Sequence, residues 1–109
     1  MKAKIVLVHF LFTDLTRSKL RPALAIHESA DDVIAAFISS KIQSPLLASD
    51  LLISPDHPRF GSTGLKVPSV IKFDKVATVS KDLIEGEIGE IPGILSGKCN
   101  DIMSRIFRL

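Results

Sequence analysis

Short apolar runs, separated by polar residues, glycine and proline, occupy most of the chain before residue 91. Apolar and β-branched runs of roughly four to eight residues between such breaks are typical of β-strands. We therefore expect strands at 5–10, 21–26, 33–38, 50–53, 69–73, 76–80 and 85–90. The run at 33–38 has no polar interruption, which predicts an interior strand buried on both faces.

The apolar period changes in the C-terminal segment. Apolar residues there recur at steps of four and three, namely at Leu95, Cys99, Ile102, Ile106 and Leu109. This spacing predicts a helix with one buried face. Because Gly93 and Gly97 each disfavour a helix interior by about 1 kcal/mol, we expect the helix to begin near Ser96. Many short strands and one terminal helix predict a mainly β fold, a small, strongly curved barrel with a helix packed on it.

Two stretches between the expected strands read as turns. Residues 54–64 contain two prolines and two glycines, which predict a loop long enough to be a mobile lid or binding loop. Asp74 and Lys75 predict a tight corner between the strands at 69–73 and 76–80.

Composition limits the domain organisation and the compartment. With 109 residues, 46% of them hydrophobic, the chain fits a single domain at 1–109. The formal net charge of +2 is too small to indicate a nucleic-acid partner by itself. One cysteine excludes an intrachain disulfide and suits a reducing cytoplasm.

Residues 1–12 imitate a signal peptide, but the charged residues that follow favour a first core strand. No apolar run is long enough to span a membrane.

Several kinds of site are not expected. Residues 61–66 lack the glycine and lysine spacing of a phosphate-binding loop and are read as a turn. His9, His27 and His57 are scattered, and neither paired cysteines nor a His-Glu-x-x-His segment is present. We therefore expect no metal site and no cofactor.

A polar, cationic loop ending in Arg21 and Pro22 carries a family resemblance. The segments 10–15 (FLFTDL), 19–24 (KLRPAL), 33–40, 63–65 and 68–79 resemble, in order and spacing, the PemK/MazF family of bacterial toxins. The resemblance implies an SH3-like barrel and a metal-independent endoribonuclease that cleaves single-stranded RNA, using the RNA's own 2′-OH to attack the adjacent phosphate. It also implies a homodimer and a cognate antitoxin as partners.

Arg21 matches the family's catalytic arginine before proline. Pro22 lacks a backbone N–H, so we expect Arg21 at the start of a strand on a sheet edge. A guanidinium is a poor base but a persistent, bidentate partner for phosphate, which predicts an electrostatic role. The alternative for Arg21 is a surface salt bridge.

Ser39 occupies the place of a family threonine or serine at the end of the third strand, where its hydroxyl could donate to phosphate. Neighbouring strand residues face opposite sides, so only one of Ser39 and Ser40 can reach the site, and the resemblance favours Ser39. Lys72 and Asp74 replace an Arg-x-Asp of some relatives. They would hold phosphate and act as base, respectively, with Phe73 turned inward; the alternative is a solvated strand face.

RNA binding would need cations and aromatic surfaces. The chain has no Trp or Tyr, and Phe10, Phe37, Phe73 and Phe107 are read as core. Phe12 and Phe60 remain as stacking surfaces, and the candidate backbone-binding residues are Thr13, Arg17, Lys19 and Lys41, with Arg59 and Lys66 nearby. The function that the family resemblance implies is that of a toxin that cleaves single-stranded mRNA in a sequence-selective way. The alternatives are a gyrase-binding toxin without nuclease activity on the same barrel, and a decayed member that only binds an antitoxin.

Overall fold

Six strands and one α-helix make up the fold of the described residues. The computed structural model describes every residue except 12–17. The strands are β1 (Lys4–Leu11), β2 (Ser18–Glu28), β3 (Asp32–Ser39), β4 (Asp50–Ile53), β5 (Ser69–Ser80) and β6 (Ile84–Glu90). The helix α1 spans Gly93–Ile106, and two short 3₁₀ helices, η1 (Phe60–Thr63) and η2 (Lys81–Leu83), lie before β5 and β6.

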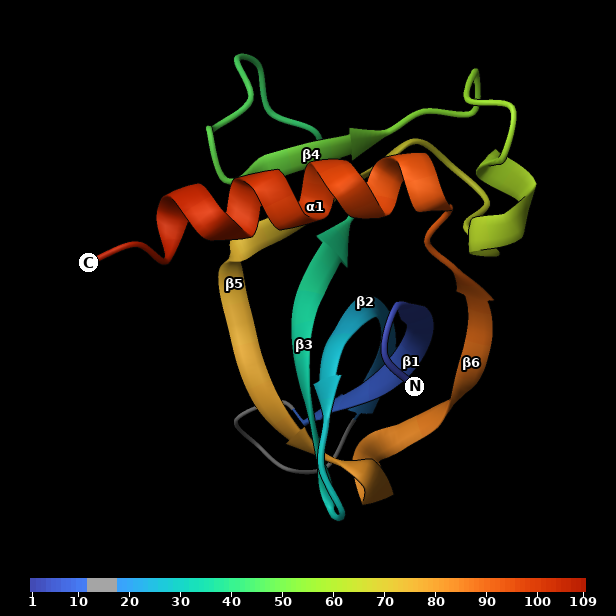
Figure 1. Cartoon of the computed structure of the whole chain (residues 1–109). Coiled ribbons are helices and arrows are strands. Elements are labelled where there is room, and N and C mark those ends of the chain that lie inside the picture. Colours follow the sequence, from blue (N-terminus) through green and yellow to red (C-terminus); the bar gives the residue numbers. More distant parts are fainter. Residues whose placement is uncertain (12–17) are drawn as a thin grey trace.

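The strands form one antiparallel sheet in the order β4-β5-β3-β2-β1-β6. The sheet curves strongly, so that β5 and β6 stand on opposite sides of the molecule with α1 across one end (Figure 1). The predicted mainly β fold with a C-terminal helix is confirmed. The sheet is not closed, because β4 and β6 remain its two edges.

The predicted corner at Asp74 and Lys75 is wrong, because β5 runs without interruption through it. The register between β3 and β5 shifts there: Ala36 pairs with Val76, whereas Phe37 pairs with Lys72. Residues 73–75 therefore have no partner in β3, which is the arrangement of a β-bulge. The polar pair is accommodated by a local irregularity and does not end the strand.

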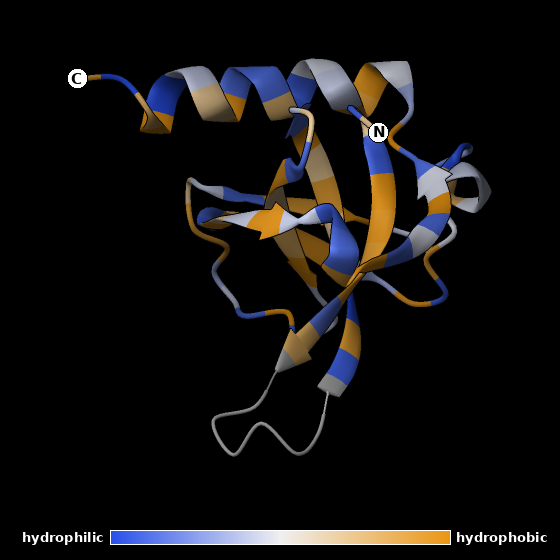
Figure 2. Ribbon diagram, turned by 90° about the horizontal axis from the view of Figure 1, so that it is seen from below, coloured by the Kyte–Doolittle hydropathy of each residue, from blue (hydrophilic) through white to orange (hydrophobic). Residues whose placement is uncertain are grey.

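Two apolar clusters fill the two faces of the sheet. In β2, Leu24 belongs to the cluster beneath α1, and Ala23 and Ala25 belong to the cluster on the other face. Neighbours in β3 divide in the same way, with Ala35 on one side and Ala36 on the other. The prediction that β3 is an interior strand buried on both faces is confirmed. Figure 2 shows the resulting richness of apolar residues along the strands.

The helix begins three residues earlier than predicted, at Gly93, directly after Pro92. Leu95, Cys99 and Ile102 are buried against the sheet as expected. Phe107 is 55% exposed, so its predicted place in the core is wrong; α1 ends at Ile106 and does not carry its buried face further. No helix among the described residues is both long and apolar enough to cross a membrane.

The segment at 54–64 is anchored to the body of the protein. Thr63 is fully buried; its hydroxyl donates to the Phe60 carbonyl at 2.6 Å and accepts from the Leu65 N–H at 3.2 Å. Gly64 has a φ of 74° and lies directly against the Ile88 carbonyl of β6. The segment contains η1 and is packed onto β6, which an interpretation as a mobile lid did not anticipate.

Candidate functional site

β2 is an interior strand of the sheet, but its first residues, Arg21 and Pro22 included, are paired with β1 alone, so the predicted edge is found at the start of this strand and not along its length. On one side Arg21 pairs with Val8 and Pro22 with Leu7 of β1. On the other side the pairs with β3 begin only at Ala23. Pro22 therefore lies in the part of β2 that extends beyond its pairing with β3. The missing N–H of proline costs no hydrogen bond to β3 at this position.

A cavity of about 310 Å³ lies beside this end of β2, and we call it the basic cavity. The residues that line it include the basic residues Lys19, Arg21 and Lys66, and none of the described carboxylates lines it. The apolar part of the lining includes Leu7, Ile38, Leu65 and Ile88. A concave surface with cations and no acid favours an anionic ligand.

The Arg21 side chain is exposed, and none of the ion pairs among the described residues involves it. The surface salt bridge that was its alternative role therefore has no partner in the described part of the chain. A guanidinium without a carboxylate partner retains its donors for an incoming phosphate.

The two serines at the end of β3 lie on different sides. Ala23 of β2 pairs with Phe37 of β3. Arg21 lies two residues before Ala23, and Ser39 lies two residues after Phe37. Because side chains alternate along a strand, both side chains lie on the same face of the sheet. Ser40 lines the basic cavity together with Pro22, and Ser39 does not. The Ser39 hydroxyl oxygen accepts from the Lys41 N–H at 3.0 Å, which leaves its own hydrogen available to donate.

Lys72 and Asp74 do not line the basic cavity. The Lys72 ammonium donates to Asp50 of β4 at 3.2 Å, and the Asp50 side chain is only 2% exposed. Phe73 is fully buried between them, as predicted, and Asp74 is exposed within the bulge. This arrangement favours a structural role for Lys72.

The remaining predicted RNA-binding residues divide into three groups. Phe12, Thr13 and Arg17 lie outside the described residues. Lys19 lines the basic cavity, and Lys41 is exposed just after β3. Phe60 is half-buried against the apolar cluster beneath α1, so its ring is not a free stacking surface.

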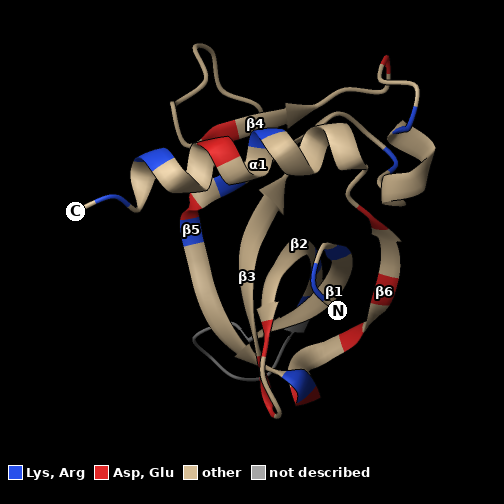
Figure 3. Ribbon diagram, in the orientation of Figure 1, with Lys and Arg blue, Asp and Glu red and all other residues tan. Residues whose placement is uncertain are grey.

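Sequence reasoning did not find the apolar wall of the basic cavity. Leu65 follows Gly64, and both lie against β6 through Ile88, which also lines the cavity. The only local signal was Gly64 itself, because a glycine is favoured where φ is positive and another backbone approaches closely. Charge gave no further guidance: Figure 3 shows acidic residues along β6 and basic residues dispersed over the fold.

Comparison with known proteins identifies the class of the chain. The family model of PemK-like, MazF-like toxins of type II toxin–antitoxin systems matches residues 2–107. The chain therefore belongs to this toxin family. A search of curated proteins found no significant sequence match.

Solved structures with the same fold include the Mycobacterium tuberculosis toxin MazF-mt6, which is 20% identical with a TM-score of 0.75 and a coverage of 97% of both chains. A mycobacterial endoribonuclease in complex with its cognate antitoxin is 16% identical in sequence, with a TM-score of 0.73; the superposition covers 100% of this chain and 95% of the endoribonuclease chain. A further mycobacterial endoribonuclease is 16% identical, with a TM-score of 0.72; the superposition covers 100% of this chain and 92% of the endoribonuclease chain. At these identities the likeness establishes the fold.

Proposed function

We propose that this protein is the toxin of a toxin–antitoxin pair and that it cleaves single-stranded RNA without a metal ion. The observation that carries the proposal is the exposed Arg21 beside the basic cavity, without a carboxylate partner among the described residues, in a chain of this family. Support also comes from the fold, which is shared with proteins described as endoribonucleases.

In the proposed reaction the 2′-OH of one nucleotide attacks the adjacent phosphorus, and the bond from phosphorus to the 5′-oxygen of the next nucleotide breaks. The proton of the 2′-OH passes to a base, and the leaving 5′-oxygen takes up a proton. Negative charge grows on the phosphoryl oxygens, where a fixed guanidinium contributes most. Arg21 supplies that charge, and the Ser39 hydroxyl donates to a phosphoryl oxygen.

Asp74 remains the proposed base, although its exposed place in the β5 bulge, outside the basic cavity, does not favour that role. Lys19 and Lys66 would attract neighbouring phosphates. Lys72 is assigned to the pair with Asp50 and not to RNA.

A homodimer and a cognate antitoxin are the proposed protein partners. Leu46, Leu47 and Leu52 are each at least 40% exposed around the edge strand β4, an apolar area of the kind that protein interfaces cover. A toxin of related structure is known in complex with its antitoxin. Light scattering of the purified protein tests the dimer.

The activity test is incubation of the purified protein with a mixed RNA, with and without a chelator. The proposal predicts fragments in both reactions, ending in 2′,3′-cyclic phosphate and 5′-hydroxyl groups. A parallel assay of DNA supercoiling by gyrase tests the alternative, a gyrase-binding toxin without nuclease activity. Intact RNA together with inhibited gyrase would contradict the nuclease and favour a gyrase-binding toxin.

A further inference from the structure

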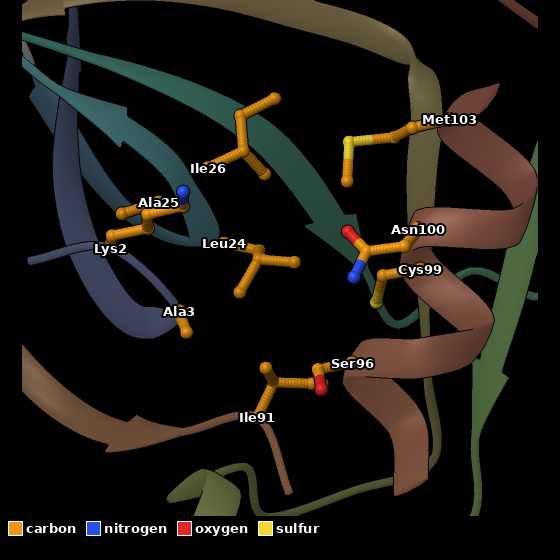
Figure 4. Close-up of a pocket in the computed structure, with 10 residues that line it drawn as sticks. All are labelled: Lys2, Ala3, Leu24, Ala25, Ile26, Ile91, Ser96, Cys99, Asn100 and Met103. Carbon is orange, nitrogen blue, oxygen red and sulfur yellow. The ribbon is translucent and has the colours of Figure 1, made fainter. Parts of the chain in front are cut away.

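A second cavity, of about 350 Å³, lies between α1 and β2, and we call it the helix cavity. Figure 4 shows Cys99, Asn100 and Met103 of α1 on one side and Leu24 and Ile26 of β2 on the other. None of the described residues lines both this cavity and the basic cavity. The helix cavity is therefore not part of the proposed RNA site.

The walls of the helix cavity are apolar. Leu24, Ile26 and Ile91 line one part of it, and Met103 and Cys99 line the helix side. Burial raises the pKa of the Cys99 thiol to about 11, so at neutral pH the thiol is uncharged and behaves as a small apolar group. The volume and the lining of the helix cavity resemble those of small-molecule sites, which are mostly apolar with a few polar groups.

The polar groups lie at the rim. Lys2 is exposed and takes part in no ion pair among the described residues, whereas the neighbouring Lys4 is paired with Glu90 at 3.0 Å. Figure 4 shows the Asn100 amide directed toward the cavity. Of the acids close in sequence to the lining residues, Glu28 is bonded to Lys81 and to the N-terminal amine, and Glu90 is paired with Lys4. Asp101, which follows Asn100, lines a different cavity of the helix. The rim thus offers a cation and an amide to an anionic group.

The backbone at the rim is held in an unusual conformation. Ala3, which lines the cavity, has a φ of 68°, in the left-handed region that residues with a Cβ rarely adopt. Its N–H donates to the Ala25 carbonyl at 2.8 Å and its carbonyl accepts from the Ile91 N–H at 2.9 Å. Backbone strain held by surrounding contacts is frequent at ligand sites. The strain is an observation independent of the shape of the cavity.

We propose that the helix cavity binds a small amphiphilic carboxylate. Its apolar chain or ring lies between Leu24 and Met103, and its carboxylate lies at the rim, where Lys2 and the Asn100 amide are donors. Binding there does not depend on the proposed RNA cleavage, because the two cavities share no residue in the part of the chain that the structure describes.

Three probes test the proposal: octanoate, its neutral counterpart 1-octanol, and acetate, which lacks the apolar chain. Each is titrated into ¹⁵N-labelled protein, and amide cross-peaks are followed. Octanoate is expected to shift the signals of Leu24, Cys99 and Met103, 1-octanol to shift the same signals more weakly, and acetate to shift none of them. Octanoate is also expected to slow alkylation of Cys99, the only cysteine of the chain. Absence of octanoate shifts at these residues in the folded protein would overturn the proposal.

Two variants and a control locate the binding. Lys2→Gln should weaken octanoate binding about tenfold and leave 1-octanol unchanged, because it removes one charge-assisted contact. Asn100→Phe, at an exposed helix position, should block both probes by filling the mouth. Lys75→Gln, an exposed lysine on β5 that lines neither cavity, should change nothing. Unchanged octanoate affinity in Lys2→Gln, or in a folded Asn100→Phe, would refute the assignment.

Discussion

The Lys72 ammonium lies 3.2 Å from a carboxylate oxygen of Asp50 and joins the long strand β5 to the edge strand β4. The other Asp50 oxygen accepts from the Leu47 N–H at 3.0 Å. Lys72→Met would leave a buried carboxylate without its cation, so we predict a loss of about 3 kcal/mol in the free energy of unfolding, measured by urea titration. Lys75→Met, at an exposed lysine without an ion pair among the described residues, should stay within about 0.5 kcal/mol.

RNA cleavage by the folded Lys72→Met variant decides between the two roles of Lys72. A structural role predicts that cleavage per folded molecule is retained. Full stability combined with lost cleavage would instead place Lys72 on the RNA.

Gly64 fixes the contact between η1 and β6. A Cβ at this position would clash with the Ile88 carbonyl, and the φ of 74° is itself unfavourable for other residues. We predict that Gly64→Ala lowers the free energy of unfolding by about 2 kcal/mol or more, measured by chemical denaturation. Gly61→Ala is the control: no atom of the described residues lies within 4 Å of a Cβ added there, so this substitution should be near neutral. Equal stability of the two variants would show that the close approach of Gly64 to β6 contributes nothing to folding.

Ser39 and Ser40 can be separated by single substitutions. Ser39 shares the face of Arg21 and has a free hydroxyl hydrogen, so Ser39→Ala should slow RNA cleavage about 100-fold and Ser39→Thr should retain most of it. Ser40→Ala should have a small effect, measured as initial rates on one RNA. The reverse pattern would show that the hydroxyl on the cavity side acts in the reaction.

Glu28 makes stability depend on pH in the acid range. Hydrogen bonds from Lys81 and from the N-terminal amine lower its pKa from 4.5 to about 2. The stabilising effect is present above pH 4.5 and is lost as the pH falls toward 2, when the folded-state carboxylate takes up its proton. Glu28→Gln should therefore show a smaller fall in stability over this range than the parent, whereas Glu87→Gln should match the parent. An NMR titration of the Glu28 carboxyl with an ordinary midpoint would contradict this.

Much of the fold follows from local patterns. The strands at 33–38 and 50–53 and the buried helix face at Leu95, Cys99 and Ile102 were predicted because each depends on its own run of apolar residues. The corner at Asp74 was predicted wrongly because turn-forming residues in β5 are accommodated by a bulge, and a bulge depends on pairing with β3. Pairing across the sheet cannot be read from one strand.

The site was predictable only in part for a related reason. Arg21 was marked by its proline neighbour and by the family resemblance, and both are local in sequence. The Asp50 partner of Lys72 lies on another strand, and the wall at Ile88 depends on how η1 packs onto β6. Such long-range contacts decide whether a charged residue can bind a ligand or is already paired with another residue of the protein.

The role of Arg21 is tested by measuring RNA cleavage by Arg21→Ala, with Arg108→Ala as the matched control, because Arg108 is an exposed arginine beyond α1. Both variants should keep the parent's thermal unfolding midpoint. We expect Arg21→Ala to cleave RNA at least about 100-fold more slowly than the parent, and Arg21→Lys to recover only a small part of the rate. Arg108→Ala should cleave normally. Parent-like cleavage by folded Arg21→Ala would contradict the central claim that this guanidinium stabilises the reacting phosphate.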